Sequence, residues 1–222
     1  MVRTAVFADR AAAGRRLGEL IQNLRPPVGV GPVEVGPVVG PVVVGMARGG
    51  VPVAHEVARI LGAPLDVVVV RKLGHPRQPE LGLGALGEDG VRVLNEPLIA
   101  RLEVTSAVLA QVAGAESQEL ARRLGIYRGD RPPLTLEGRT VIVVDDGLAT
   151  GFTARAAVEV VRRRLAARVV LAVPVGSPEA TIPLRSVADE VVCLETTDRF
   201  FGISEWYGDF TQVTDDEVAA LL

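Results

Sequence analysis

Hydrophobic residues gather in short runs along the chain, and each run has the length of a strand. The runs are rich in Val and Ile and are bounded by Gly, Pro or charged residues. Continuous apolar runs of about four to eight residues are typical of strands buried on both faces, as in a parallel sheet. The pattern predicts strands over 42–46, 65–70, 141–144, 168–174 and 190–194, with a further short strand over 91–94.

Between these runs the apolar residues recur at helical spacing. Leu17, Leu20, Ile21 and Leu24 predict an amphipathic helix over 8–24, and Asp9 is a suitable N-cap for it. Composition and spacing also predict helices over 51–61, 96–124 and 154–164. Strands and helices therefore alternate, which favours an α/β fold with a mostly parallel central sheet and helices on both faces.

Length and charge narrow the class of protein. A chain of 222 residues is enough for one well-buried α/β domain and too short for two of ordinary size. The net charge is −3 and no basic run is present, so a nucleic acid is not an expected partner. The single cysteine, Cys193, offers no disulfide framework or zinc cluster. Without a signal-peptide pattern or a membrane-length apolar run, we expect a cytoplasmic protein that does not bind membranes.

The stretch 141–153, with the sequence VIVVDDGLATGFT, is the segment of the chain that says most about ligand binding. A buried strand ends at Asp145 and Asp146, and a loop of Gly and Thr residues then leads into a helix. Unpaired N–H groups at the start of that helix form an anion site, to which Thr150 and Thr153 add hydroxyl donors, so a phosphate fits there. Two adjacent carboxylates accept hydrogen bonds well from a vicinal diol. Phosphate and diol together predict a site for a ribose 5-phosphate.

A second anion site is predicted directly after the first strand, where the sequence is Ala47-Arg48-Gly49-Gly50. Paired glycines let the backbone approach a ligand closely, and Arg48 adds positive charge.

Two basic residues, Arg71 and Lys72, follow another strand and emerge at the same type of sheet edge. Lys72 is the single lysine among 24 Lys and Arg residues. Its compact ammonium group suits a pyrophosphate, for which the planar fork of an arginine would demand a bidentate partner. A solvated surface lysine is the alternative.

Two segments rich in Gly and Pro are predicted to be irregular. Residues 26–41 are expected to form an extended loop, and residues 74–95 a long, hinge-rich segment that ends in the strand over 91–94. A lid over a pyrophosphate, with His75 and Arg77 reaching it on closure, is one interpretation of the second segment. A plain flexible hairpin is the other.

The 141–153 stretch resembles the 5-phosphoribosyl 1-pyrophosphate (PRPP) binding motif of the type I phosphoribosyltransferases, which has a hydrophobic strand, two acidic residues, a few small residues and Thr-Gly-x-Thr. Two positions depart from the family pattern. Gly147 stands where the family usually has an aliphatic residue, which loosens the loop in our interpretation. Ala149 stands where the 6-oxopurine enzymes carry an Asp, so the general base is left unassigned.

The resemblance implies a Rossmann-like, single phosphoribosyltransferase domain over 1–222. Its core would span about 42–195, its flexible active-site loop about 74–95, and a small hood would form from about 1–30 and 196–222. Five of the eight aromatic residues lie in the C-terminal hood segment, at Phe200, Phe201, Trp206, Tyr207 and Phe210. These rings either stack on a nucleobase or close the core or an oligomer interface.

The implied activity is that of a pentosyltransferase, which transfers ribose 5-phosphate from PRPP to a nitrogenous base and releases pyrophosphate. Mg²⁺ is expected as a cofactor held mainly by PRPP and water, not by a protein metal site. A homodimer is left open. The alternatives are a PRPP-binding regulator without chemistry and, with less support, a sugar-phosphate hydrolase.

Carried over residue by residue, the resemblance gives Lys72, Asp145 and Asp146 catalytic roles, with the two carboxylates on the ribose hydroxyls. A loop such as 47–50 holds the pyrophosphate in the family, and 148–153 would wrap the 5-phosphate. The full set of expected substrate-binding residues is Ala47, Arg48, Gly49, Gly50, Arg71, Lys72, Asp145, Asp146, Gly147, Leu148, Ala149, Thr150, Gly151, Phe152 and Thr153.

Overall fold

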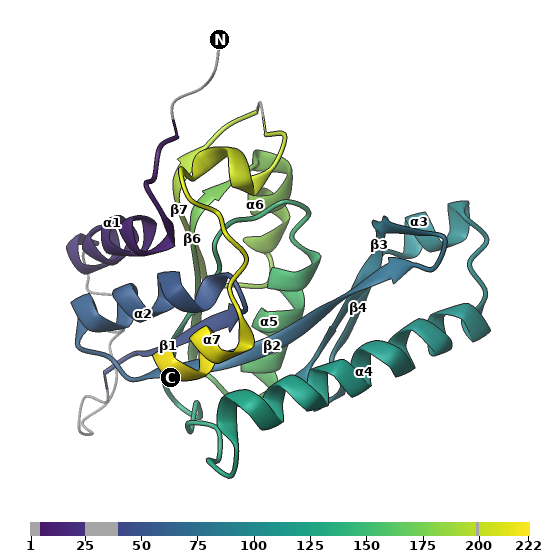
Figure 1. The fold of residues 1–222 in the computed structure, drawn as a ribbon, viewed down its shortest axis with the longest axis horizontal. Helices are drawn as coiled ribbons and strands as arrows, with labels where there is room; N and C mark the ends of the chain where they lie inside the picture. Colours follow the sequence, from purple (N-terminus) through teal and green to yellow (C-terminus); the bar gives the residue numbers. More distant parts are fainter. Residues whose placement is uncertain (1–4, 25–39, 199) are drawn as a thin grey trace.

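A central sheet organises the computed structural model, which describes residues 5–24, 40–198 and 200–222 (Figure 1). Its strands in that part of the chain are β1 (Val42–Ala47), β2 (Leu65–His75), β3 (Gln78–Gly87), β4 (Arg92–Leu94), β5 (Thr140–Val144), β6 (Arg168–Gly176) and β7 (Glu190–Thr196). They lie in the order β4-β3-β2-β1-β5-β6-β7. β1, β2, β5, β6 and β7 run parallel, whereas β3 and β4 are antiparallel additions at one edge. The expected mostly parallel sheet is confirmed.

Helices cover both faces of the sheet, as predicted. They are α1 (Arg10–Asn23), α2 (Gly50–Leu61), α3 (Glu96–Arg101), α4 (Ser106–Arg128), α5 (Phe152–Arg163), α6 (Pro178–Leu184) and α7 (Asp215–Leu221), with 3₁₀ turns at Glu88–Gly90 and Ile203–Trp206. Side chains of β1 alternate between the faces: Val42 and Val44 pack with α5, whereas Val43 packs with α1 and α2. On the same face as α2, α4 packs against β2, and α7 packs against α4 and α2. No helix in the described ranges is both long enough and apolar enough to cross a membrane.

Local capping accounts for where several helices begin. Asp9 caps α1 by accepting a hydrogen bond from the Ala12 amide at 2.7 Å, as the sequence predicted. The single helix predicted over 96–124 is corrected to two helices. Glu103 takes a left-handed backbone conformation (φ 50°) and Thr105 caps a new helix, so the chain turns between α3 and α4.

The irregular segment predicted over 74–95 is corrected, because most of it is strand, and of its two interpretations the hairpin describes its backbone. β2 continues past the core and pairs with β3 in an antiparallel hairpin, and β4 pairs with β3 in turn. Glycines in this region serve close packing: a Cβ on Gly84 (φ 151°) would lie 2.1 Å from the Val93 carbonyl oxygen, and one on Gly74 would lie 2.7 Å from that of Pro79. Whether the hairpin moves remains a prediction.

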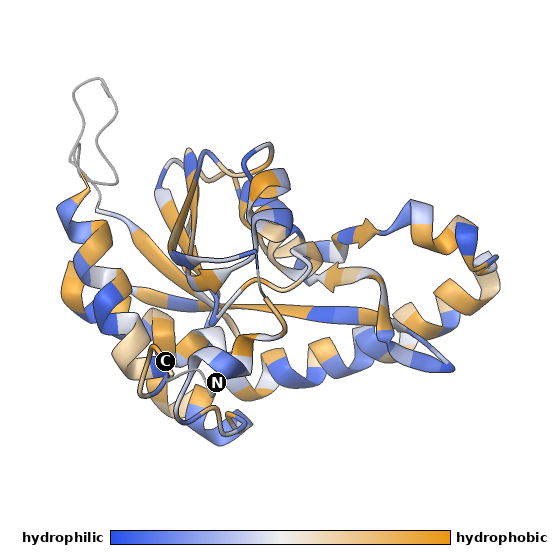
Figure 2. Ribbon diagram, turned by 90° about the horizontal axis from the view of Figure 1, so that it is seen from above, coloured by the Kyte–Doolittle hydropathy of each residue, from blue (hydrophilic) through white to orange (hydrophobic). Residues whose placement is uncertain are grey.

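Together with α3 and the N-terminal half of α4, this hairpin forms an arm that projects from the core (Figures 1 and 2). We use "arm" for residues 72–112. In Figure 2 the central strands are strongly apolar, while polar and apolar residues alternate along α4. That alternation is expected of a helix with one buried and one solvated face.

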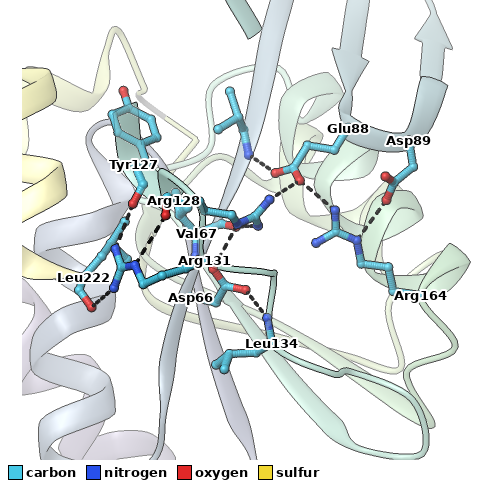
Figure 3. A network of polar contacts seen from close by, with 11 residues as sticks. Asp66, Val67, Glu88, Asp89, Tyr127, Arg128, Arg131, Leu134, Arg164 and Leu222 are labelled. Atoms are coloured by element: carbon cyan, nitrogen blue, oxygen red, sulfur yellow. Dashed lines mark hydrogen bonds and ion pairs between the residues drawn. The ribbon is translucent and has the colours of Figure 1, made fainter. Parts of the chain in front are cut away.

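A buried polar network joins the base of the arm to the core (Figure 3). The Glu88 side chain, with 2% exposure, accepts hydrogen bonds from the Val69 amide at 2.7 Å and from Arg128 and Arg164 at 2.7 and 2.6 Å. Asp66 accepts from the Leu134 amide at 2.8 Å. The network therefore ties β2, the Glu88–Gly90 turn, α4 and the end of α5 to one another.

Segments from the two ends of the chain pack together. The Phe7 amide donates to the Trp206 carbonyl at 2.9 Å, and the Gly208 amide donates to the Phe7 carbonyl at 2.8 Å. We call residues 200–211 the tail segment. Trp206 and Tyr207 are buried in this segment, which fits the interpretation that these rings close the core. Phe201, by contrast, is 84% exposed. The loop predicted over 26–41 falls, apart from its last two residues, outside the described part of the chain.

Candidate functional site

A cavity of about 410 Å³ opens where the carboxyl ends of the parallel strands meet the arm. Ligands bind at this edge in open α/β sheets. The residues that line it are Lys72, Glu80, Leu81, Gly82, Gly84, Asn95, Leu98, Asp145, Gly147, Leu148, Ala149, Thr150, Gly151, Phe152, Thr153 and Ile203. We use "motif loop" for residues 145–153, which follow β5. The cavity therefore has one wall from the motif loop, one from the arm, and a contact with the tail segment.

The motif loop has the strand, loop and helix arrangement that the sequence predicted. β5 ends at Val144, and α5 begins at Phe152 after Gly151, whose left-handed conformation (φ 78°) suits glycine. The Leu148 amide donates to the Val175 carbonyl at 2.9 Å, which fixes the middle of the loop against β6. The first turn of α5 thus faces the cavity with backbone N–H groups that lack helical partners, and Thr150 and Thr153 line the same wall.

The two motif carboxylates lie in different surroundings. Asp145 lines the cavity, and its Oδ1 accepts a hydrogen bond from the Asp146 amide at 2.9 Å. Burial raises the pKa of Asp145 well above its usual value, and the negative charge of Asp146 raises it further. Burial also raises the pKa of Asp146, an effect that Arg10 opposes from a distance of 2.9 Å. Asp146 is absent from the cavity lining.

The loop Ala47 to Gly50 lies against this acidic pair, and the Ala47–Arg48 peptide bond is cis. A Cβ on Gly49 would lie 2.0 Å from Asp146 Oδ2, and one on Gly50 would lie 2.6 Å from the Val144 carbonyl oxygen. Both glycines are therefore needed for the loop to approach β5 so closely. Arg48 points toward α7, where its Nη1 lies 3.8 Å from Asp215.

The two basic residues of β2 point in different directions, as successive strand residues do. Lys72 lines the cavity, and its Nζ donates to the Glu80 carbonyl at 2.8 Å. Arg71 instead forms an ion pair of 2.7 Å with Glu116 on α4. The structure thus brings Lys72 and the motif loop to one cavity, and it places Arg71 outside the lining.

Sequence reasoning did not identify several of the residues at this site. The arm contributes Glu80, Leu81, Gly82, Gly84, Asn95 and Leu98. All of these except Leu98 had been assigned to an irregular loop. The tail contributes Ile203, whose Cγ2 and Cγ1 lie 2.8 and 2.9 Å from where a Cβ on Gly147 would be. Ile203 therefore occupies the space that an aliphatic side chain at 147 would fill. In the sequence, the only sign of such a partner was the glycine at position 147, where the family usually has an aliphatic residue.

Comparison with known proteins identifies the class. The family model of the phosphoribosyl transferase domain matches residues 12–207, so the chain belongs to this family, as the resemblance of residues 141–153 to the family motif indicated. The solved structure of TT1426 from Thermus thermophilus is 43% identical, with a TM-score of 0.76 and an alignment that covers 97% of this chain and 96% of that one. A Neisseria gonorrhoeae protein solved with bound ppGpp shares the fold at 15% identity and a TM-score of 0.51, with an alignment over 100% of this chain and 96% of that one.

Curated relatives agree with this assignment. Two Mycobacterium tuberculosis proteins, Rv0571c and MT0597, are provisionally named phosphoribosyl transferases and are 48% identical over 217 residues. The alignment covers 98% of this chain but 46% of each relative. The chain therefore spans about half the length of these relatives.

Proposed function

We propose that the protein transfers ribose 5-phosphate from PRPP to a nitrogenous base and releases pyrophosphate. One observation carries the proposal: a single cavity joins a helix N-terminus with two threonines, a carboxylate and an ammonium group. These groups match a phosphate, a ribose diol and a pyrophosphate, which are the three parts of a 5-phosphoribosyl donor.

The cavity suggests a role for each group that lines it. The N–H groups and hydroxyls of Thr150–Thr153 would hold the 5-phosphate, and Asp145 would accept hydrogen bonds from the ribose hydroxyls. Lys72 would stabilise the charge that develops on the leaving pyrophosphate. Arg48 and the Gly49–Gly50 backbone, which lie outside the cavity lining, are further candidates for the pyrophosphate. Pre-positioned charges of this kind act in the transition state, where pyrophosphate leaves and the sugar becomes electron-deficient.

Mg²⁺ fits this site as an ion brought by PRPP. Among the residues that the structure describes, no group of three or more His, Cys, Asp or Glu side chains could hold a metal. The cavity lining includes two acidic residues, Asp145 and Glu80, and carboxylates suit a hydrated ion already bound to phosphate oxygens. When bound, Mg²⁺ would neutralise charge on the pyrophosphate.

Ala149 narrows the range of bases that can act as the acceptor. A 6-oxopurine must lose a ring-nitrogen proton as it attacks, and an alanine side chain can neither accept that proton nor bind the nitrogen. We propose an acceptor that is ionised before it enters, such as an acidic pyrimidine, and we expect hypoxanthine and guanine to be poor substrates.

Product analysis tests the proposed function. The protein is incubated with PRPP, Mg²⁺ and a panel of bases, and nucleoside 5′-monophosphates are sought by mass spectrometry. Formation of one such product with an equivalent of pyrophosphate is expected. If calorimetry shows PRPP binding but no base yields a product, the protein is a PRPP-binding regulator and not an enzyme. Robust turnover of hypoxanthine or guanine would contradict the acceptor assignment.

A further inference from the structure

The arginine between β1 and α2 faces a carboxylate from a helix near the other end of the chain. We call residues 47–50 the glycine loop. In this loop, Arg48 Nη1 lies 3.8 Å from Asp215 Oδ1, and the two side chains are 23% and 20% exposed. A separation of 3.8 Å is too long for a hydrogen bond. Asp215 therefore offsets part of the charge of the guanidinium without binding its N–H donors.

Asp215 is held in place by two side chains of α4. Its Oδ1 accepts a hydrogen bond from the Tyr127 hydroxyl at 2.6 Å, and its Oδ2 accepts one from Arg122 Nη2 at 2.9 Å. The Tyr127 hydroxyl and, after it, Arg122 hold the pKa of Asp215 below its usual value, so the carboxylate keeps its charge at neutral pH. The oxygen that faces Arg48 is thus already bound by Tyr127.

The helix that presents Asp215 is itself fixed along its length. α7 packs against both α2 and α4, and Val218 is fully buried there (Figure 1). At its other end, the Leu221 carbonyl oxygen lies 3.3 Å from His55 Nδ1 of α2, and Arg131 donates to the Leu222 carbonyl at 3.3 Å (Figure 3). Since α2 begins at the last residue of the glycine loop, α7 places a fixed negative charge beside that loop.

We infer that Asp215 is a positioning residue for the pyrophosphate site: it stores the Arg48 guanidinium beside the glycine loop until a pyrophosphate competes for it. The inference rests on the proposed function, in which Arg48 is a candidate ligand of the pyrophosphate. A partly exposed pair without a hydrogen bond contributes little, so the guanidinium exchanges it readily for an anion of several charges. The same competition weakens the hold on pyrophosphate and so eases its release after transfer.

Loss of the Asp215 charge should therefore tighten pyrophosphate binding. Asp215→Asn keeps an oxygen for the Tyr127 hydroxyl but no longer attracts Arg48. The dissociation constant of pyrophosphate with Mg²⁺, measured by calorimetry, should fall about two- to fivefold, which is the equivalent of one weak ion pair. Asp215→Ser, which also retains an oxygen for Tyr127, should give the same result. Damage to the fold would weaken binding instead, so an unchanged or raised dissociation constant would overturn the inference.

The neighbouring Asp216 offers a matched control. It is exposed, lies in the same first turn of α7 and carries the same charge. Asp216→Asn therefore removes an equal charge from the same helix end without touching the contact with Arg48, and it should leave the dissociation constant near that of the wild type. Equal tightening in Asp215→Asn and Asp216→Asn would mean that only the net charge matters, which contradicts storage.

The effect must also pass through Arg48. Arg48→Gln should weaken pyrophosphate binding by about tenfold, as loss of a hydrogen bond from a charged group does. Adding Asp215→Asn to Arg48→Gln should then change nothing further. Tightening in that background would show that Asp215 acts on another group, such as the released Arg122, and would overturn the inference.

Thermal unfolding without ligand separates the ion pair from the proposed function. The midpoints of Arg48→Gln, Asp215→Asn and the double variant form a double-mutant cycle. The double variant should lose less than the sum of the two single losses, whereas strictly additive losses would overturn the pairing. A wild-type protein that binds neither pyrophosphate nor PRPP would contradict the proposed function and with it the storage role, while the cycle would still decide whether Arg48 and Asp215 interact.

Discussion

Asp145 is a carboxylic acid in a place that disfavours its charge. Burial and the neighbouring Asp146 charge both raise its pKa above the usual value for aspartate. A ribose hydroxyl donates most strongly to the ionised form, so a bound sugar would offset part of the cost of ionising this group.

We expect PRPP binding to weaken on acidification at a pH above that of an ordinary aspartate. The sign follows from the raised pKa: the carboxyl is ionised only above that pKa and takes up a proton as the pH falls through it. Calorimetric titration of PRPP across the acidic range measures the effect. Asp145→Asn is the control, because it keeps any pH dependence that comes from the phosphates of PRPP itself. Identical pH profiles in the two proteins would argue against a role for Asp145.

Lys72→Arg should not be a silent change, although the chain uses arginine at every other basic position. Lys72 lines the cavity, where a bulky planar fork would misplace the pyrophosphate and cost about 1–3 kcal/mol of charge-assisted hydrogen bonding. Titration of pyrophosphate measures the loss. The control is the reverse exchange at an exposed position of the arm, Arg92→Lys, which should not change the pyrophosphate affinity. Equal affinities in the wild type, Lys72→Arg and Arg92→Lys would show that Lys72 is a solvated surface residue.

Gly147 and Ile203 should behave as a complementary pair. Gly147→Ala places a methyl group 2.8 Å from the Ile203 side chain and should lower the free energy of unfolding by about 1–3 kcal/mol, the usual range for overpacking. Ile203→Ala makes room for that methyl group, so adding it to Gly147→Ala should restore part of the loss. Denaturant unfolding of the two single variants and the double variant measures the coupling. Strictly additive effects would mean that the two side chains do not meet.

At the scale of elements, the Glu88 network decides how the arm meets the core. Glu88 links Val69 of β2 with Arg128 of α4 and Arg164, which follows α5. These contacts join helices from opposite faces of the sheet. Loss of these contacts would therefore disturb how whole helices and strands pack, and not only the position of a single side chain.

Glu88→Gln should lower the free energy of unfolding by roughly 3–5 kcal/mol, because two arginines would lose the carboxylate that compensates their charge in a buried place. Chemical denaturation measures the change. Glu159→Gln is the matched control, since Glu159 pairs with Arg155 on the exposed side of α5 and such pairs contribute about 0–1 kcal/mol. A loss as small as that of the control would show that the network adds little to stability.

At the scale of the whole molecule, the arm replaces the irregular loop that the sequence suggested. Hydrogen exchange distinguishes the two. Peptides from 83–94 should be protected in the free protein, because β3 pairs with both β2 and β4 there. Peptides from 74–80 should exchange faster, since the hairpin end is exposed and its register is irregular. Fast exchange throughout 74–94 would instead favour a mobile loop.

The sequence predicts best what is local. The six predicted strands, the first helix with its Asp9 cap and the strand, loop and helix order of the motif are coded by neighbouring residues, and all of these are confirmed, whereas β3 was not predicted. Glycines misled the interpretation of 74–95, because a glycine that permits close strand packing looks the same in sequence as one that permits a flexible turn. The Arg10–Asp146 pair and the contact of Ile203 with Gly147 join distant segments, and no local pattern encodes them.

One strand, β2, belongs to both the core and the arm. It pairs in parallel with β1 as far as Val69, and from Val70 onward it pairs with β3 in the antiparallel hairpin, where Lys72 lies opposite Ala85. Strands bend and twist without breaking their ladder hydrogen bonds. The separation between the Lys72 ammonium and the Asp145 carboxylate therefore depends on the curvature of one continuous strand that joins the arm to the core.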